Sequence, residues 1–263
     1  METSTANKIL SNNNLIDNLQ DNSTALELKH LKKSFADNLV LNDITFNIKK
    51  GENLVILGKS GSGKTLLIKC IAGLEDADCG SLKILGKNIY DLKENELIEI
   101  RKKIGFLFQS GALYDSMTVE ENLEFPLRKT LRLKSINEIK LLVDEALQNV
   151  GLSESINKMP SELSGGMRKR LSLARTLILK PEILLYDEPT TGLDPITSKE
   201  ISQLIMDVKK KYRTSSIIIT HDMECARITA DRIIILKDGL CYSEGTYLEL
   251  EKSEDKWVRS FFE

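Results

Sequence analysis

The sequence predicts an α/β fold with a mainly parallel sheet, and three observations support this prediction. Short apolar runs at residues 54–57, 183–186, 216–220 and 233–236 are typical of strands buried on both faces. Segments with helical spacing of apolar residues separate several of these runs. A glycine, an acidic residue or a histidine stands at the end of each run. Because folds of this class bind ligands at the carboxyl ends of their strands, we expect the functional residues at that edge.

The composition suits a globular protein with a buried core. Of the 263 residues, 41% are apolar and 29% are charged, and the formal net charge is -2. No apolar run reaches the about 18 residues that a membrane span needs, so no spanning segment is predicted. The 37 basic and 39 acidic residues nearly balance, which argues against indiscriminate binding of nucleic acid. A membrane role must therefore come from a local surface or from a partner.

The four cysteines do not indicate a metal site or a disulfide framework. They are Cys70, Cys79, Cys225 and Cys241. None is spaced as C-x-x-C, and the chain has only two histidines. We expect reduced thiols in a cytosolic protein.

Residues 1–24 are rich in Asn, Ser and Thr and predict a disordered polar tail. The apolar pairs at 9–10 and 15–16 are too short for a signal peptide, and the segment lacks the arginines of a transit peptide. A short helix over residues 9–19 is the alternative.

Ordered structure is expected from Ala25 onwards. Residues 26–28 and 44–48 alternate apolar and polar side chains, as half-buried strands do. The buried strand at 54–57 ends at Gly58, and a helix over 64–74 should follow it. A further strand is expected at 104–108.

The second half of the chain predicts a helical insertion followed by the remaining strands. Residues 136–150 and 167–179 have apolar side chains at helical spacing, so we expect a helical subdomain over about 111–180. The strand at 233–236 runs into a Lys-Asp-Gly turn, which predicts a hairpin with residues 240–244.

The segment from Gly58 to Thr65 matches the phosphate-binding pattern G-x-x-x-x-G-K-[ST] without a departure. It also follows an expected strand and opens an expected helix, which is the context that the pattern requires. We expect its backbone N–H groups and the helix N-terminus to surround phosphate oxygens. Lys64 should neutralise the β- and γ-phosphates, and the Thr65 hydroxyl should ligate Mg²⁺. The expected nucleotide-binding residues of this loop are Gly58, Lys59, Ser60, Gly61, Ser62, Gly63, Lys64 and Thr65.

Two adjacent carboxylates follow the apolar strand at 183–186. Asp187 is expected to hold Mg²⁺, directly or through water, and Glu188 to act as the general base for the attacking water. A solvated turn is the ordinary interpretation of two neighbouring acids. The preceding phosphate-binding loop and buried strand favour the catalytic one.

The pentapeptide Leu163-Ser164-Gly165-Gly166-Met167 precedes the expected helix at 167–179. Ser164 can cap this helix, and the two glycines can expose its first amides to an anion. Together with the two motifs above, this segment resembles the signature of the ATP-binding-cassette (ABC) ATPases, usually LSGGQ. The resemblance covers about residues 26–250, with a proposed ABC ATPase domain over 25–250. It implies a P-loop NTPase core with an antiparallel β subdomain and the inserted helical subdomain.

The resemblance assigns roles to four further positions. Gln109 resembles the glutamine that senses Mg²⁺ and the attacking water. Asp194 lies in a Gly-Leu-Asp segment that resembles the loop approaching the other subunit. His221 resembles the switch histidine that contacts the γ-phosphate. Phe35 stands where the family places an aromatic ring on adenine, although a core phenylalanine is the competing interpretation.

The family's architecture implies a homodimer with ATP and Mg²⁺ as cofactors. In that arrangement Ser164, Gly165 and Gly166 contact the γ-phosphate held by the loop of the opposite subunit. Two chains then enclose two ATP molecules, and hydrolysis lets them separate.

Two local features resemble the Mla/Mce-associated branch of the family, which energises phospholipid transport across bacterial envelopes. They are the segment 108–127 and the signature segment, in which Met167 replaces the usual glutamine. This resemblance implies a membrane permease and, indirectly, an Mce-type lipid-binding protein as partners, with no direct nucleic-acid partner. It also implies a peripheral location on the cytoplasmic face of the inner membrane.

Two surfaces and the C-terminus carry further expectations. Residues 112–125 should form much of the groove for a permease coupling helix, with Leu113, Tyr114, Met117 and Val119 as exposed apolar anchors. The basic run 168–170 is interpreted as a solvated helix face, with anionic lipid headgroups as the alternative. Aromatic residues at i, i+4 spacing predict a final amphipathic helix over 251–263.

Other members of the family perform other tasks, and three alternatives remain open. The chain could serve a transporter for another substrate, such as an amino acid or a metal complex. It could be an envelope regulator that gates cell-wall enzymes, or a DNA- or ribosome-associated ATPase. The last class carries long insertions or fused cassettes, which this sequence lacks.

Overall fold

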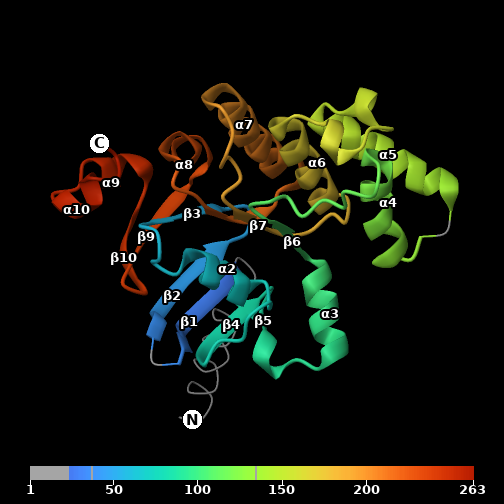
Figure 1. Cartoon of the computed structure of the whole chain (residues 1–263). Coiled ribbons are helices and arrows are strands. Elements are labelled where there is room, and N and C mark those ends of the chain that lie inside the picture. The colour runs from blue at the N-terminus through green and yellow to red at the C-terminus, as the bar shows by residue number, and fades with distance from the viewer. Residues whose placement is uncertain (1–23, 37, 134) are drawn as a thin grey trace, which may run out of the picture.

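The computed structural model describes residues 24–36, 38–133 and 135–263 (Figure 1). The tail expected over residues 1–24, and the alternative helix at 9–19, lie outside the described residues apart from Thr24. Thr24 was expected in the tail, but it is the first residue of strand β1, where it pairs with Lys49.

The described strands form one mixed sheet in the order β5-β4-β1-β2-β10-β9-β3-β8-β7-β6. Strands β9, β3, β8, β7 and β6 are parallel neighbours, whereas β1, β2, β4 and β5 pair antiparallel. The fold class predicted from the sequence is therefore confirmed. The strands are β1 (Thr24–Phe35), β2 (Asn38–Lys49), β3 (Asn53–Gly58), β4 (Cys79–Ile84), β5 (Lys87–Asn88), β6 (Ile104–Leu107), β7 (Ile183–Asp187), β8 (Ser215–Ile219), β9 (Arg232–Lys237) and β10 (Leu240–Gly245).

The expected hairpin at 233–244 is formed by β9 and β10, and the helix expected at 136–150 is present with those bounds. Two other helices differ from expectation at their ends. The helix expected over 64–74 stops at Ile71, ahead of Gly73 with its φ of 66°. The helix expected from 167 begins at Gly165, because Ser164 caps it. The helices are α2 (Lys64–Ile71), α3 (Glu94–Lys102), α4 (Val119–Lys129), α5 (Ile136–Val150), α6 (Gly165–Leu177), α7 (Pro195–Tyr212), α8 (Met223–Thr229), α9 (Tyr247–Glu251) and α10 (Lys256–Arg259).

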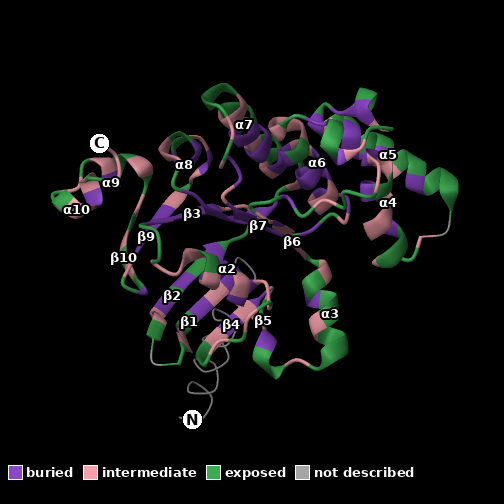
Figure 2. Ribbon diagram, in the orientation of Figure 1, coloured by how far each residue is buried: buried purple, intermediate pink, exposed green. Residues whose placement is uncertain are grey.

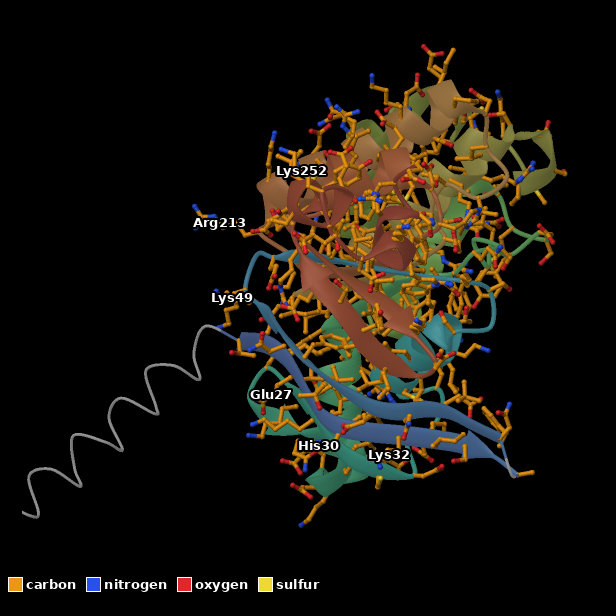
Figure 3. The ribbon with its side chains drawn as sticks, turned by 90° about the vertical axis from the view of Figure 1, so that its left-hand side faces the viewer. Glu27, His30, Lys32, Lys49, Arg213 and Lys252 are labelled. Carbon is orange, nitrogen blue, oxygen red and sulfur yellow. The ribbon has the colours of Figure 1, made fainter. Side chains whose placement is uncertain are left out.

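The parallel strands separate two hydrophobic layers (Figures 1 and 2). Side chains alternate between the faces of a strand, and β3 sends Val55 and Leu57 to one layer and Leu54 and Ile56 to the other. The first layer packs against α4 to α8, and the second against α2 and the antiparallel strands. Seen from the side, the charged residues Glu27 and Lys32 lie on β1, away from the helical layer (Figure 3). None of the helices in the described part of the chain is long and apolar enough to cross a membrane.

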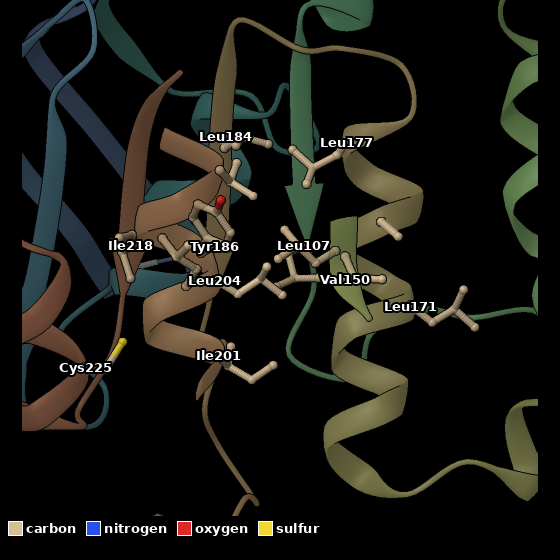
Figure 4. Packing of buried hydrophobic residues seen from close by; sticks show 14 of the residues in the cluster. Leu107, Val150, Leu171, Leu177, Leu184, Tyr186, Ile201, Leu204, Ile218 and Cys225 are labelled. Carbon is tan, nitrogen blue, oxygen red and sulfur yellow. The ribbon is translucent and has the colours of Figure 1, made fainter. Parts of the chain in front are cut away.

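Tyr186 is the largest fully buried side chain of the first layer (Figure 4). Its hydroxyl has no hydrogen-bond partner among the described residues, and burial raises its pKa well above the usual range. A buried hydroxyl without a partner costs about 1–3 kcal/mol, whereas an apolar group of the same shape avoids this cost. The ring therefore stabilises the core and its oxygen does not.

Tyr186→Phe is accordingly expected to leave the free energy of unfolding unchanged or to raise it by about 1 kcal/mol. Urea unfolding followed by circular dichroism measures this. Leu184→Ala on the same strand is the control, and its cavity should cost about 2–5 kcal/mol. A loss above about 1 kcal/mol in Tyr186→Phe would show that the hydroxyl has a partner.

The helix expected over residues 251–263 is wrong in extent. The segment instead contains the end of α9 and the four-residue helix α10. The side chain of Asp255 accepts from the N–H groups of Trp257 and Val258, which starts a new helix rather than continuing the previous one. Trp257, Phe261 and Phe262 pack against the first layer of the same chain. The expected aromatic spacing is real, and it serves docking onto the chain's own core.

Candidate nucleotide-binding site

The glycine-rich loop joins the end of β3 to the start of α2. Gly63 occupies the N-cap of α2 with a φ of 94°, a conformation that L side chains rarely adopt. A Cβ atom at this position would lie 2.8 Å from Leu41 Cδ2, so the loop passes directly over β2. No side chain of the described residues caps α2, so its first N–H groups are available to an anion.

Lys64 holds the interior of the loop. Its ammonium group donates to the backbone oxygen of Gly58 at 2.8 Å and to that of Lys59 at 3.1 Å. Burial lowers the pKa of Lys64, and the nearby charges of Glu188 and Asp187 oppose this shift. The cation therefore lies between the loop and the acidic end of β7.

The neighbouring strands β8, β7 and β6 deliver the other expected residues to the same edge. Ile219, the last residue of β8, is in register with Asp187, and Leu107 at the end of β6 is in register with Tyr186. The chain therefore emerges at one edge just before His221, Glu188 and Gln109. A cavity of about 550 Å³ opens there. Its lining residues are Val40, Gly58, Ser60, Gly61, Gly63, Lys64, Thr65, Leu66, Gln109, Glu188 and His221.

Glu188 is the best-held acid of this cavity. Its side chain is 13% exposed, its Oε2 lies 2.8 Å from His221 Nδ1, and it accepts at 3.0 Å from the Thr191 hydroxyl. Its backbone has a φ of 51°, in the left-handed region that few non-glycine residues occupy. Such a geometry aims a carboxylate into the cavity from a fixed backbone.

Asp187 precedes it and is 6% exposed. Burial raises the pKa of Asp187, as does the charge of Glu188, while Lys69, Lys169 and Lys64 act in the opposite direction. Its Oδ1 atom is buried and has no hydrogen-bond partner within the described residues. A carboxylate oxygen without a hydrogen-bond partner is free to coordinate Mg²⁺.

The site expected for a dimer draws residues from both subunits. Some of the predicted residues accordingly lie outside this cavity. Ser164 caps α6 by accepting from the N–H of Met167 at 3.3 Å. A Cβ atom on Gly166 would lie 2.5 Å from Thr197 Cγ2, and Asp194 accepts from the N–H of Thr197. The structure thus brings Ser164, Gly165, Gly166 and Asp194 to one common surface, apart from the residues that line the cavity.

Four more predicted residues, Asp187, Phe35, Lys59 and Ser62, are not among the residues that line the cavity. Phe35 ends β1 and is 51% exposed, with Lys33 Nζ at 5.4 Å from its ring centroid. The ring is therefore not a core residue, which removes the competing interpretation. Lys59 and Ser62 line a second depression of about 370 Å³, next to Trp257.

Several contacts of the site were not predicted from the sequence. Thr191 holds Glu188, and Val40 lines the cavity. Lys169 was interpreted as part of a solvated basic face, but it is 8% exposed and contacts the backbone of Gln109 and Glu188. The correction follows from helix periodicity, because Lys169 shares the buried face of α6 with Leu173 and Leu177.

A comparison with protein-family models matches residues 41–191 to the family described as ABC transporter. The chain belongs to the ABC transporter family. As an ABC cassette it is an ATP-binding subunit and an ATPase. Its fold and its glycine-rich loop agree with the resemblance found in the sequence.

The ABC cassette is 42% identical over 237 residues to the "Probable ribonucleotide transport ATP-binding protein mkl" of Mycobacterium leprae. The match covers 90% of this chain and 68% of that protein. The "Methionine import ATP-binding protein MetN" of Brucella abortus is 39% identical over 220 residues, covering 84% of this chain. The cassette spans only 59% of MetN.

Solved ABC cassettes have the same fold. One is the dimeric post-hydrolysis state of the cassette MJ0796 bound to ADP and Pi, at a TM-score of 0.76 and 35% identity. That match covers 84% of this chain and 98% of the other. Another is cbiO1 from Clostridium perfringens, part of the transporter complex cbiONQ, at a TM-score of 0.78 and 30% identity. It covers 85% of this chain and 89% of cbiO1.

Proposed function

We propose that this ABC cassette energises phospholipid transport across a bacterial cell envelope, together with a membrane permease and an Mce-type lipid-binding protein. ATP hydrolysis follows from membership of the family. The phospholipid as the transported substrate is our proposal. The observation that carries it is the signature segment, in which Met167 takes the place of the usual glutamine. Met167 is half-buried and packs against the first hydrophobic layer, where a glutamine amide would lack comparable apolar contacts.

A homodimer accounts for the separation of the two predicted halves of the site. The cavity holds the phosphate loop with Gln109, Glu188 and His221. Ser164, Gly165, Gly166 and Asp194 lie on the other surface of the same chain. We propose that two copies face each other, so that each cavity is closed by the partner's copy of that surface. The dimeric MJ0796 cassette bound to ADP and Pi supports this arrangement.

Within that closed site, we propose the following division of labour. The loop amides and Lys64 bind the triphosphate. Glu188 accepts a proton from the attacking water, and His221, at 2.8 Å from its carboxylate, contacts the γ-phosphate. Gln109 positions the water, and Phe35 stacks on adenine.

Mg²⁺ fits the donors that surround the loop. No group of three or more His, Cys, Asp or Glu suited to a metal occurs among the described residues. The proposed donors are therefore the Thr65 hydroxyl, Gln109 and the unpartnered oxygen of Asp187, together with the phosphates. When bound, Mg²⁺ neutralises the charge on the β- and γ-phosphates.

A groove of about 910 Å³ between α3 and the end of α4 is the proposed permease dock. Its lining includes the cations Arg101, Lys102, Lys129 and Arg132 with the single acid Glu99. Exposed Ile98 and Leu131 supply apolar anchors. We therefore expect the permease segment to carry acidic side chains beside apolar ones.

The groove predicted over residues 112–125 needs correction, because none of these residues lines the groove between α3 and the end of α4. Val119 was expected as an exposed anchor in the segment 112–125, but it is fully buried. The side chain of Thr118 caps α4 and turns Val119 into the first hydrophobic layer. Tyr114 remains 40% exposed, and its ring contacts the tilted ring of Phe125 at 4.9 Å between centroids.

Transport of another substrate is the second candidate. The relatives named for ribonucleotide transport and methionine import favour it, since their cassettes share about two fifths of their residues with this chain. The two candidates predict different cargo and the same permease groove.

Affinity purification from native membranes, with mass spectrometry of proteins and lipids, tests the proposal. We expect a permease, an Mce-type protein and phospholipid to co-purify, and the purified complex to move labelled phospholipid between vesicles only with ATP. Recovery of ribosomes or DNA would contradict it, as would a permease complex that carries an amino acid or a nucleotide and no phospholipid.

A charge-reversed groove provides the matched comparison. The double variant Lys129→Glu and Arg132→Glu should lose the permease. Lys252→Glu reverses an exposed charge near α9, on the side of the molecule opposite to α3 and α4, and should keep it (Figures 1 and 3). Equal recovery of the permease with the groove variant and with Lys252→Glu would remove the groove from the proposal.

A further inference from the structure

We infer that Lys169 is a positioning residue that ties the signature helix α6 to both Gln109 and Glu188, so that the two reach their working positions together. The inference rests on the proposed roles of these two residues. It adds a residue that neither the sequence motifs nor the family match assigns a role.

Lys169 joins three separate parts of the chain. Its ammonium group donates to the backbone oxygen of Gln109, which follows β6, and at 3.3 Å to that of Glu188, which follows β7. Lys169 itself lies in the second turn of α6, beginning from Gly165. One side chain therefore joins the helix that starts at the signature to both loops of the cavity.

This bridge is buried, which makes it hard to break. Lys169 is only 8% exposed, although lysine is seldom buried without a partner. Burial lowers its pKa, and the charges of Asp187 and Glu188 oppose that shift. An ammonium group taken out of water must keep its hydrogen bonds, because leaving them unmade is costly. The side chain consequently resists any movement of one loop without the other.

The same bridge fixes the unusual backbone of Glu188. Its φ of 51° lies in the left-handed region, so this conformation needs support from its surroundings. The N–H of Glu188 donates to the oxygen of Ile219 at 2.9 Å, and its own oxygen accepts from Lys169. Both backbone polar groups of Glu188 are thereby held in hydrogen bonds. The fixed backbone in turn fixes the direction of the carboxylate.

The Gln109 loop is also packed against α6 beyond this hydrogen bond. A Cβ atom on Gly111 would lie 2.5 Å from Ser172 Oγ, one turn along the helix from Lys169. A shift of α6, driven at its N-terminus by contacts of Ser164 with a partner's nucleotide, would therefore move the Gln109 loop and the Glu188 backbone together. Closure of the site and alignment of the catalytic groups become one event.

Steady-state ATPase kinetics of Lys169→Met test the inference in the full-length protein. Methionine keeps much of the length of the side chain and removes its charge and donors. We expect kcat to fall about 10- to 100-fold, because a misplaced catalytic group costs rate. KM for ATP should change less than about threefold, since the loop that binds the phosphates is untouched. Lys169→Arg, which keeps the charge and the donors, should recover at least about a third of the wild-type kcat.

Arg170→Met is the matched control. Arg170 follows on the same helix and contacts Glu200 and the oxygen of Val150, without reaching either loop. It reports general loosening of α6, and its kcat should stay within about threefold of wild type. If Lys169→Met does not fold, as judged by its melting transition, Lys169→Gln takes its place with an expected fall in kcat of at least about fivefold.

The inference is overturned if the folded Lys169 variant keeps kcat within about twofold of wild type, or if Arg170→Met loses as much. It is also overturned if Lys169→Arg is as slow as Lys169→Met. Parallel measurement of Glu188→Gln distinguishes failure of the proposed general base from failure of the Lys169 bridge. Full turnover in Glu188→Gln would refute the proposed base, whereas a dead Glu188→Gln beside a normal Lys169→Met would refute only the bridge.

Discussion

Glu188→Gln is expected to lower kcat for ATP hydrolysis about 1,000-fold while leaving ATP affinity nearly unchanged. The amide keeps the shape of the side chain but cannot accept a proton from water, and a positioned general base contributes about 10²–10⁴ in rate. Phosphate release measures the turnover, and size-exclusion chromatography with light scattering measures the assembly. With ATP bound and not cleaved, the variant should accumulate as a dimer.

Glu182→Gln is the control for this experiment. Glu182 directly precedes β7, at the end opposite to Glu188, where it is exposed and pairs with Lys103 at 2.8 Å. Its turnover should equal that of the wild type. A Glu188→Gln protein that stays monomeric in saturating ATP, or that hydrolyses it at the normal rate, would argue against Glu188 as the base.

Lys64→Ala should raise the Kd for ATP about 10- to 150-fold. Hydrogen bonds to charged groups contribute about 1.5–3 kcal/mol, and Lys64 is the cation placed between the loop and the acids at the end of β7. Isothermal titration calorimetry measures the change. The control is Lys87→Ala, on the exposed strand β5, and it should bind ATP as the wild type does. Unchanged affinity in Lys64→Ala would refute the assignment of the loop.

The edge of the sheet that carries the cavity could be predicted because its rules are local. The segment from Gly58 to Thr65 predicts a turn and the start of a helix. Asp187 and His221 each follow an apolar run. Parallel strands then bring their ends together whatever the loops between them do. The strand order, which decides that β8 lies between β3 and β7, depends on packing of distant segments and was not predicted.

The burial of Lys169 was not predicted from the sequence. A run of three basic residues normally marks a solvated face, and for Arg168 the side chain is indeed exposed. Lys169 lies four and eight residues before Leu173 and Leu177, so it shares their buried face of α6. This periodicity identifies Lys169 as buried only when the helix is known to pack on both loops. The C-terminal helix was overextended for a related reason, because Asp255 can cap a new helix as readily as it can sit within an old one.

The two surfaces of the cassette also bear on inheritance. If two copies pair as proposed, each copy contributes its phosphate loop to one site and its Ser164 surface to the other. A defect in the Ser164 surface of one copy would then disable the site built on the phosphate loop of a sound partner. In a cell that makes both, we expect the damaged allele to be dominant, with the few intact pairs setting what activity remains.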